Sequence, residues 1–246
     1  MRRRAPAQPR ARGQTAAMHQ RFTVASPAGR DLPTDVVTYG PDVPREDTLK
    51  LLGSVEGKRI LDLGCGAGHN ALALARQGAK VIGVDESSDQ IAEARAACER
   101  EGLKVELHHA PLAELAFIRA DTIDATLSVH GLAPVDDLDR VFRQVDRVLH
   151  PEHPLVLSMP HPAFAMVDTD DPERRVQRSY WDRAPIDGDV PRTISHLFTA
   201  LGRANFRVDT VLEPEPDTSG PRSPQWHDHM RYVPATLIIR ARKQGI

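Results

Sequence analysis

The sequence predicts an α/β fold in three layers, in which helices cover both faces of a mostly parallel sheet. Short apolar runs alternate with segments of helical periodicity between residues 59 and 160, and this alternation is typical of parallel sheets. A glycine-rich turn, "LDLGCGAGHN", joins the first apolar run to the first helical segment. Because such sheets bind ligands at the carboxyl ends of their strands, this turn marks the expected site.

Seven strands are expected, each a short apolar run bounded by polar or turn residues. Expected helices follow the first, second, fourth and fifth strands, whereas no clear helix separates the last two. We therefore expect the last two strands to pair antiparallel. The expected strands are 59–63, 80–85, 104–108, 122–129, 154–159, 206–214 and 235–243.

Four helices are expected from apolar residues spaced three or four apart and from signals at the helix ends. The second helix opens with a Ser-x-x-Gln capping box at Ser87, and a glycine closes each of the first two. The expected helices are 69–78, 87–102, 134–151 and 192–205.

The chain is expected to form one domain after an amino-terminal extension. Its 246 residues, 40% of them hydrophobic, are enough for a single α/β core. Residues 1–20 are rich in arginine and lack apolar periodicity, so we expect them to be disordered. In the single domain 21–246, we expect segments 21–50 and 160–192 to cap the site.

Charge and cysteine content restrict the partners of the protein. Lys and Arg number 32 and Asp and Glu 34, so no global field attracts nucleic acid or an anionic membrane. No apolar run approaches the ~18 residues of a membrane span, and the arginine-rich start lacks the apolar segment of a signal peptide. Two cysteines build neither a disulfide framework nor a zinc site. We expect a cytoplasmic protein without a bound metal, and the sequence leaves open whether it is a monomer or a homodimer.

Residues beside the glycine turn favour S-adenosylmethionine over a dinucleotide. The dinucleotide fingerprint would place glycine at position 69, which is His69. Asp62 would repel a pyrophosphate bound to backbone N–H groups, but it suits the amino group of S-adenosylmethionine. Asp85, at the end of the second strand, would accept hydrogen bonds from a ribose in either cofactor. An NAD(P)-dependent oxidoreductase therefore remains an alternative.

The motifs "ILDLGCGAG", "VIGVDES" and "TIDATLSVHGLAPVDDLDRVFRQVDRVLHPEHPLVLS" resemble the class I S-adenosylmethionine-dependent methyltransferase family over roughly residues 50–160. The resemblance implies a Rossmann-like methyltransferase fold with strand order 3-2-1-4-5-7-6 and an antiparallel strand seven. "MPHP" and "RTISHLFTAL" are also similar to segments of actinobacterial small-molecule methyltransferases. A member that binds the cofactor or a partner protein without catalysis is a further alternative.

The resemblance also implies roles for individual residues. Asp62, Gly64, Cys65 and Gly66 would line the methionine part of the cofactor. Asp85 would hold the ribose hydroxyls, and Glu86 and Gln90 would flank the ribose and the adenine. Ser128 and Val129 would lie under the sulfonium.

Adenine recognition departs from the family pattern. Pro111 stands where many members carry an acid that accepts from the adenine amino group. Either backbone groups near Ala110 and Leu112 would then recognise adenine, or the affinity for the cofactor would be reduced. Tyr39 is expected to pack over the cofactor from the amino-terminal side, with plain core packing as its alternative.

The expected reaction is methyl transfer to oxygen or nitrogen of a small molecule. In-line displacement at a sulfonium chiefly requires alignment and exclusion of water. A hydroxyl or ammonium acceptor must also lose a proton, for which histidine is a suitable base. His130 and His161 follow the fourth and fifth strands and are the candidates; each would otherwise stabilise its loop. Tyr180 and Trp181 would stack on a flat acceptor or anchor the cap on the core.

Overall fold

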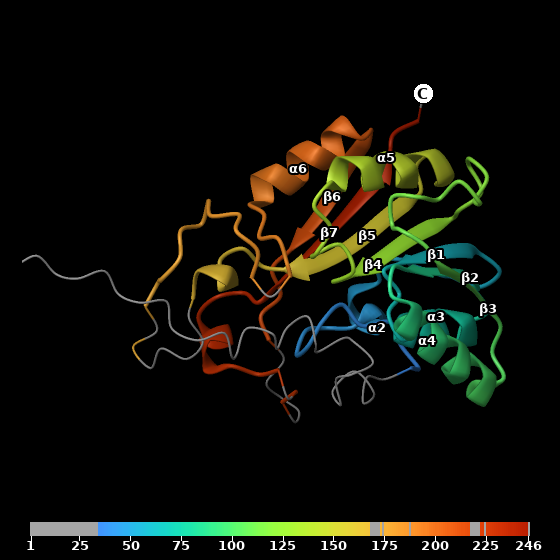
Figure 1. Ribbon diagram of the computed structural model, residues 1–246, viewed down its shortest axis with the longest axis horizontal. Coiled ribbons are helices and arrows are strands. Elements are labelled where there is room, and N and C mark those ends of the chain that lie inside the picture. Colours follow the sequence, from blue (N-terminus) through green and yellow to red (C-terminus); the bar gives the residue numbers. More distant parts are fainter. Residues whose placement is uncertain are drawn as a thin grey trace, which may run out of the picture.

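The computed structural model describes residues 34–167, 173, 175–186, 188–216, 222–223 and 225–245. The extension predicted to be disordered, 1–20, lies outside the described residues, as does part of the predicted cap, 21–33. The described elements form one sheet with helices on both faces (Figure 1). None of the helices described has the length and apolar character needed to cross a bilayer.

The sheet confirms the predicted strand order. Its seven strands lie in the order β3-β2-β1-β4-β5-β7-β6, and β7 is antiparallel to both β5 and β6. β4 begins at Ala125 rather than at residue 122, because Ile123 makes only an isolated bridge. The strands are β1 Arg59–Leu63, β2 Lys80–Asp85, β3 Val105–His109, β4 Ala125–Val129, β5 Pro154–Pro160, β6 Phe206–Leu212 and β7 Thr236–Lys243.

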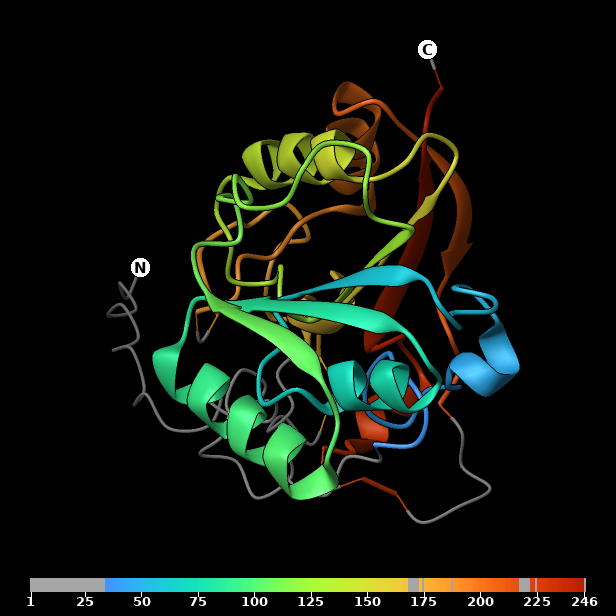
Figure 2. The same cartoon turned by 90° about the vertical axis from the view of Figure 1, so that its right-hand side faces the viewer.

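Helices cover the two faces of the sheet. α5 and α6 lie on one face, and α2, α3 and α4 on the other (Figures 1 and 2). The predicted N-terminal capping interaction of α4 is present, since the Ser87 side chain accepts a hydrogen bond from the Gln90 N–H. The helices are α2 Glu46–Leu49, α3 His69–Arg76, α4 Ser88–Glu101, α5 Leu138–Val148 and α6 Ile194–Arg203, with short 3-10 helices at Phe164–Met166 and Asp228–Arg231.

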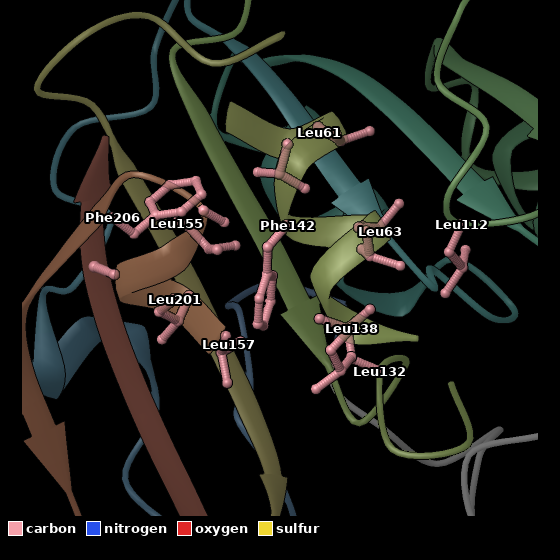
Figure 3. Packing of buried hydrophobic residues seen from close by; sticks show 14 of the residues in the cluster. Leu61, Leu63, Leu112, Leu132, Leu138, Phe142, Leu155, Leu157, Leu201 and Phe206 are labelled. Carbon is pink, nitrogen blue, oxygen red and sulfur yellow. The ribbon is translucent and has the colours of Figure 1, made fainter. Parts of the chain in front are cut away.

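Alternation along β1 divides its side chains between two cores. Leu61 and Leu63 pack with Phe142 of α5 in the larger core (Figure 3). Ile60 packs on the opposite face with residues of α3. Because side chains alternate along a strand, Asp62 shares the face of Ile60. The sheet therefore turns the Asp62 carboxyl towards the side on which α3 begins.

Two segments predicted to form the cap lie at the carboxyl edge of the sheet. The Tyr39 carbonyl accepts from the Ser158 hydroxyl of β5 at 2.6 Å. A Cβ added to Gly40 would lie 3.1 Å from His130 Nε2, just after β4. Figure 1 shows the chain that follows β5 running beyond the carboxyl end of that strand. Both segments thus border the edge where ligands bind in this architecture.

Candidate active site

The glycine turn uses its first three amides within the protein. Gly64 and Cys65 donate to the Val84 carbonyl at 2.8 and 3.1 Å. The Gly66 N–H donates to Asp85 Oδ2 at 2.8 Å. A pyrophosphate would have to displace these acceptors to reach the amides. These hydrogen bonds therefore disfavour the dinucleotide alternative, and they could not be predicted from the sequence.

Asp62 is a buried carboxyl with an unused oxygen. It is 2% exposed, and Oδ2 has no hydrogen-bond partner among the described residues. Burial, together with the charge of Asp85, raises its pKa to about 7, and the Ala71 amide at the start of α3 partly opposes the rise. A cationic ligand group would satisfy the free oxygen and favour the ionised form.

Asp85 fixes the geometry of the turn and the following loop. Its Oδ1 accepts from Ser87 N–H at 2.9 Å, while Oδ2 holds Gly66. A carboxylate has about four acceptor positions, so two remain for ribose hydroxyls. Gln90 lies in the first turn of α4, and its side chain is buried with Oε1 unpartnered in the part of the chain that is described.

The amides near Pro111 are already engaged. Ala110 N–H donates to the Asp85 carbonyl at 3.1 Å. Leu112 N–H donates to Glu86 Oε1 at 3.0 Å. The expectation that these amides recognise adenine is therefore not supported, because both already have acceptors. Glu86 instead joins the end of β2 to the loop after β3.

Gly131, which no local sequence signal marks as a site residue, contacts the glycine turn. A Cβ on Gly64 would lie 2.6 Å from the Gly131 Cα, and a Cβ on Gly131 would lie 2.7 Å from the Gly64 Cα. Only glycine at both positions allows this approach without moving backbone. The loop after β4 is thereby held directly against the turn after β1.

Two predicted contact residues have structural partners. The Ser128 hydroxyl is buried and donates to the Leu63 carbonyl at 2.6 Å, which supports the end of β1. The Cys65 thiol is buried, and burial raises its pKa well above the usual range. Cys65 is thus a neutral packing residue beside Gly83. Val129 is half-buried at the end of β4.

His130 lies where its position after β4 predicts. It has a left-handed backbone, with φ of 56°, and its amide donates to the Ser158 carbonyl at 2.9 Å. Burial lowers its pKa to about 4, while the Asp189 charge and the Tyr39 carbonyl act in the opposite direction. The imidazole is therefore neutral at pH 7, although weakly basic.

His161 is engaged at both ring nitrogens. Nδ1 accepts from the Ala163 N–H at 3.1 Å, so Nε2 carries the proton and donates to Glu213 Oε1 at 2.9 Å. The residue is only 4% exposed. This arrangement fits the turn-stabilising alternative, because neither nitrogen is available to an acceptor molecule.

Tyr39 does not face the cofactor edge as expected. Its side chain is fully buried in the core on the α3 face, and its hydroxyl donates to Glu46 Oε2 at 2.5 Å. The Glu46 carboxylate also accepts hydrogen bonds from the backbone N–H groups of Leu51, Leu52 and Gly53. The phenol adds a fourth donor to this buried carboxylate, which accounts for the ring pointing into the core.

The predicted aromatic pair lies in the segment 160–192 that is predicted to form the cap. Tyr180 and Trp181 meet edge to face with ring centroids 5.9 Å apart. The Tyr180 hydroxyl accepts from Ile194 N–H at 3.4 Å, whereas Trp181 is 79% exposed. Tyr180 is therefore anchored to the start of α6, and Trp181 has an open face. No group of three metal-ligating side chains occurs within the described ranges.

Comparisons with known proteins agree with this geometry. Residues 60–152 match a family model described as a methyltransferase domain. A solved S-adenosylmethionine-dependent methyltransferase from Mesorhizobium loti has a TM-score of 0.68 and 28% identity, over 79% of this chain and 94% of that one.

Two curated relatives extend the comparison. A Haemophilus influenzae protein described as uncharacterized is 26% identical over 82% of this chain and 87% of its own length. A ubiquinone biosynthesis O-methyltransferase from Bordetella avium is 35% identical over 42% of each chain. The alignment thus spans less than half of that enzyme. Residues 60–152 thus match a methyltransferase domain, and the sheet order and the structural likeness over 79% of this chain support a class I S-adenosylmethionine-dependent methyltransferase.

Proposed function

We propose that the protein transfers a methyl group from S-adenosylmethionine to an oxygen or nitrogen of a small molecule. The observation that carries the proposal is the pair of carboxyls beside the glycine turn, Asp62 with a free buried oxygen and Asp85 with free acceptor positions. The relation to a ubiquinone biosynthesis O-methyltransferase favours a small-molecule acceptor.

The residues present fit this cofactor. The orphaned Oδ2 of Asp62 suits an ammonium group, Asp85 suits a ribose diol, and the buried Gln90 Oε1 suits a further donor. When bound, S-adenosylmethionine supplies an activated methyl group on a sulfonium. The chain's own task is then to align the acceptor and keep water out.

Proton removal from the acceptor is the second task. His130 follows β4, the strand whose end the family places under the sulfonium, and it is neutral at pH 7. A neutral imidazole can accept a proton, although a pKa near 4 makes it a weaker base than one near 7. His161 would instead hold the turn after β5 through Glu213.

A labelling experiment tests the proposed function. The full chain is incubated with S-adenosylmethionine carrying a deuterated methyl group and a bacterial metabolite extract, and products are sought by mass spectrometry. We expect one metabolite to gain a single labelled methyl group in the presence of the protein. Tight binding of S-adenosylhomocysteine without any labelled product would favour the non-catalytic alternative.

Replacing Asp85 by Ala is expected to weaken the binding of S-adenosylhomocysteine by about 10- to 100-fold, or about 1–3 kcal/mol. The substitution removes the ribose acceptor and also the partner of Gly66 and Ser87. Asp85→Asn keeps one acceptor oxygen and should lose less affinity. Calorimetric titration of both variants measures the difference, and equal affinity in all three proteins would remove Asp85 from the site.

His130→Gln is expected to reduce the methylation rate of the identified acceptor by about 10²-fold while leaving the affinity for S-adenosylhomocysteine within about twofold. Gln keeps polar atoms but cannot accept a proton at neutral pH. His108→Gln is the control, since His108 lies on the edge strand β3 with Glu106 as its partner. Initial rates at saturating cofactor give the result, and an unchanged rate would show that His130 is not the base.

A further inference from the structure

Arg192 is a buried cation whose hydrogen bonds, among the described residues, all go to backbone carbonyls. It is 4% exposed, and Nη1 donates to Ala133 at 3.2 Å and to Val190 at 2.8 Å. Nη2 donates to Val135 and, at 3.3 Å, to Asp136. No carboxylate forms an ion pair with this guanidinium within the part of the chain described. A single side chain is therefore hydrogen-bonded both to the loop after β4 and to the end of the cap segment.

Arginine is suited to this position, and lysine is not. The guanidinium presents donors in a fixed planar fork, so one group can serve several carbonyls, whereas an ammonium is a compact point donor. Burial, with the nearby charge of Arg183, lowers the pKa of Arg192 to about 10. The side chain therefore remains charged at pH 7, and its charge strengthens each hydrogen bond.

The cap segment adds its own contacts to the same loop. Ile186 and Asp189 exchange backbone hydrogen bonds at 2.8 and 2.9 Å, and Val190 N–H donates to the Ala133 carbonyl at 3.0 Å. Asp189 also raises the pKa of both His130 and Arg192, so its charge lies near the two side chains. Asp189 and Val190 are thus fixed beside the loop.

The loop held in this way contains two residues of the candidate site. It starts at His130, whose φ of 56° is costly for a residue other than glycine and requires surrounding support. Gly131 comes next and touches Gly64 of the glycine turn. A continuous path of contacts therefore runs from the cap through Arg192 to the turn after β1.

We propose that Arg192 is a positioning residue that locks the loop 130–136 to the cap segment and so holds His130 and Gly131 against the glycine turn. The link to ligand binding rests on the proposed function, but the lock itself does not. Release of the cap segment would make the loop mobile, and the glycine turn after β1 would then lose its contact with Gly131.

Arg192→Lys tests the lock, with Arg192→Met as a second variant that removes the charge. Arg203→Lys is the matched control, because Arg203 is an exposed residue at the end of α6. Amide hydrogen exchange is measured along the full chain, with and without S-adenosylhomocysteine, and the affinity for S-adenosylhomocysteine is measured by calorimetry.

For both Arg192 variants we expect exchange in residues 131–136 to accelerate at least about tenfold while amides of β1 and β2 stay unchanged. The affinity for S-adenosylhomocysteine should fall about five- to tenfold, and Arg203→Lys should match the wild type. Unchanged exchange in 131–136, or equal acceleration throughout the sheet, would overturn the proposal. If the wild type fails to bind S-adenosylhomocysteine, the proposed function fails, while the exchange data still decide whether Arg192 locks the loop.

Discussion

Replacing Asp62 by Asn is expected to weaken the binding of S-adenosylhomocysteine at least about 100-fold, equivalent to about 3 kcal/mol, at pH 8. The buried Oδ2 of Asp62 has no partner among the residues described, so a ligand ammonium would supply its missing hydrogen bond. Asn offers no charge to that ammonium. Calorimetry on the two proteins gives the comparison.

The same substitution should stabilise the folded chain at alkaline pH. Burial and Asp85 raise the pKa of Asp62 from 3.8 to about 7, so between these values the folded chain holds a proton that the unfolded chain releases. Stability therefore falls as the pH rises through this window, with a cost on the order of 4 kcal/mol above pH 7. Asn carries no such cost, so Asp62→Asn should gain stability relative to the wild type between pH 5 and pH 8.

Urea unfolding at pH 5 and pH 8 measures this gain. Asp47→Asn is the control, because the Asp47 side chain is 55% exposed and its loss should change the pH dependence little. A ligand affinity equal to that of the wild type in Asp62→Asn would exclude Asp62 from the cofactor site. Equal stability of the two proteins at pH 8 would show that the carboxyl is not buried in its charged form.

Gly131→Ala is expected to destabilise the chain by about 2–3 kcal/mol and to weaken the binding of S-adenosylhomocysteine. The new Cβ would lie 2.7 Å from the Gly64 Cα and 2.9 Å from the Leu63 carbonyl oxygen, so backbone on one side has to move. Any movement displaces either the loop after β4 or the glycine turn.

Gly202→Ala provides the matched control for this steric prediction. Gly202 lies in α6, and a Cβ there would meet nothing within 4 Å. This variant should be stabilised by up to about 1 kcal/mol, because alanine favours the helix. Urea unfolding measures the stability of both variants. A Gly131→Ala protein as stable as the wild type would mean that the loop after β4 and the glycine turn are not in fixed contact.

Local signals in the sequence were sufficient to predict the seven strands and the helices α3 to α6, although not the short helix α2. Strands such as 59–63 and 80–85 are apolar runs whose bounds match the structure, and the capping box at Ser87 starts α4 as expected. The order of the strands came from the family resemblance, and the sheet confirms it. Only the antiparallel pairing of the last two strands followed from the pattern itself.

The candidate site was predictable only in part, because much of it depends on contacts between distant residues. Asp62 and Asp85 could be chosen from their places beside the turn. Two of these contacts join segments far apart in the chain: Gly131 approaches Gly64, and Arg192 donates hydrogen bonds to the loop after β4. For Tyr39, core packing was only the alternative expectation, because its buried partner, Glu46, gives no local signal.

The most direct test of the central claim is a calorimetric titration of the full chain at pH 8 with S-adenosylmethionine, S-adenosylhomocysteine and NAD⁺ in turn. If the carboxyls beside the glycine turn select a cationic methyl donor, the first two ligands should bind and NAD⁺ should give no measurable heat of binding. Binding of NAD⁺ without binding of S-adenosylmethionine would contradict the account.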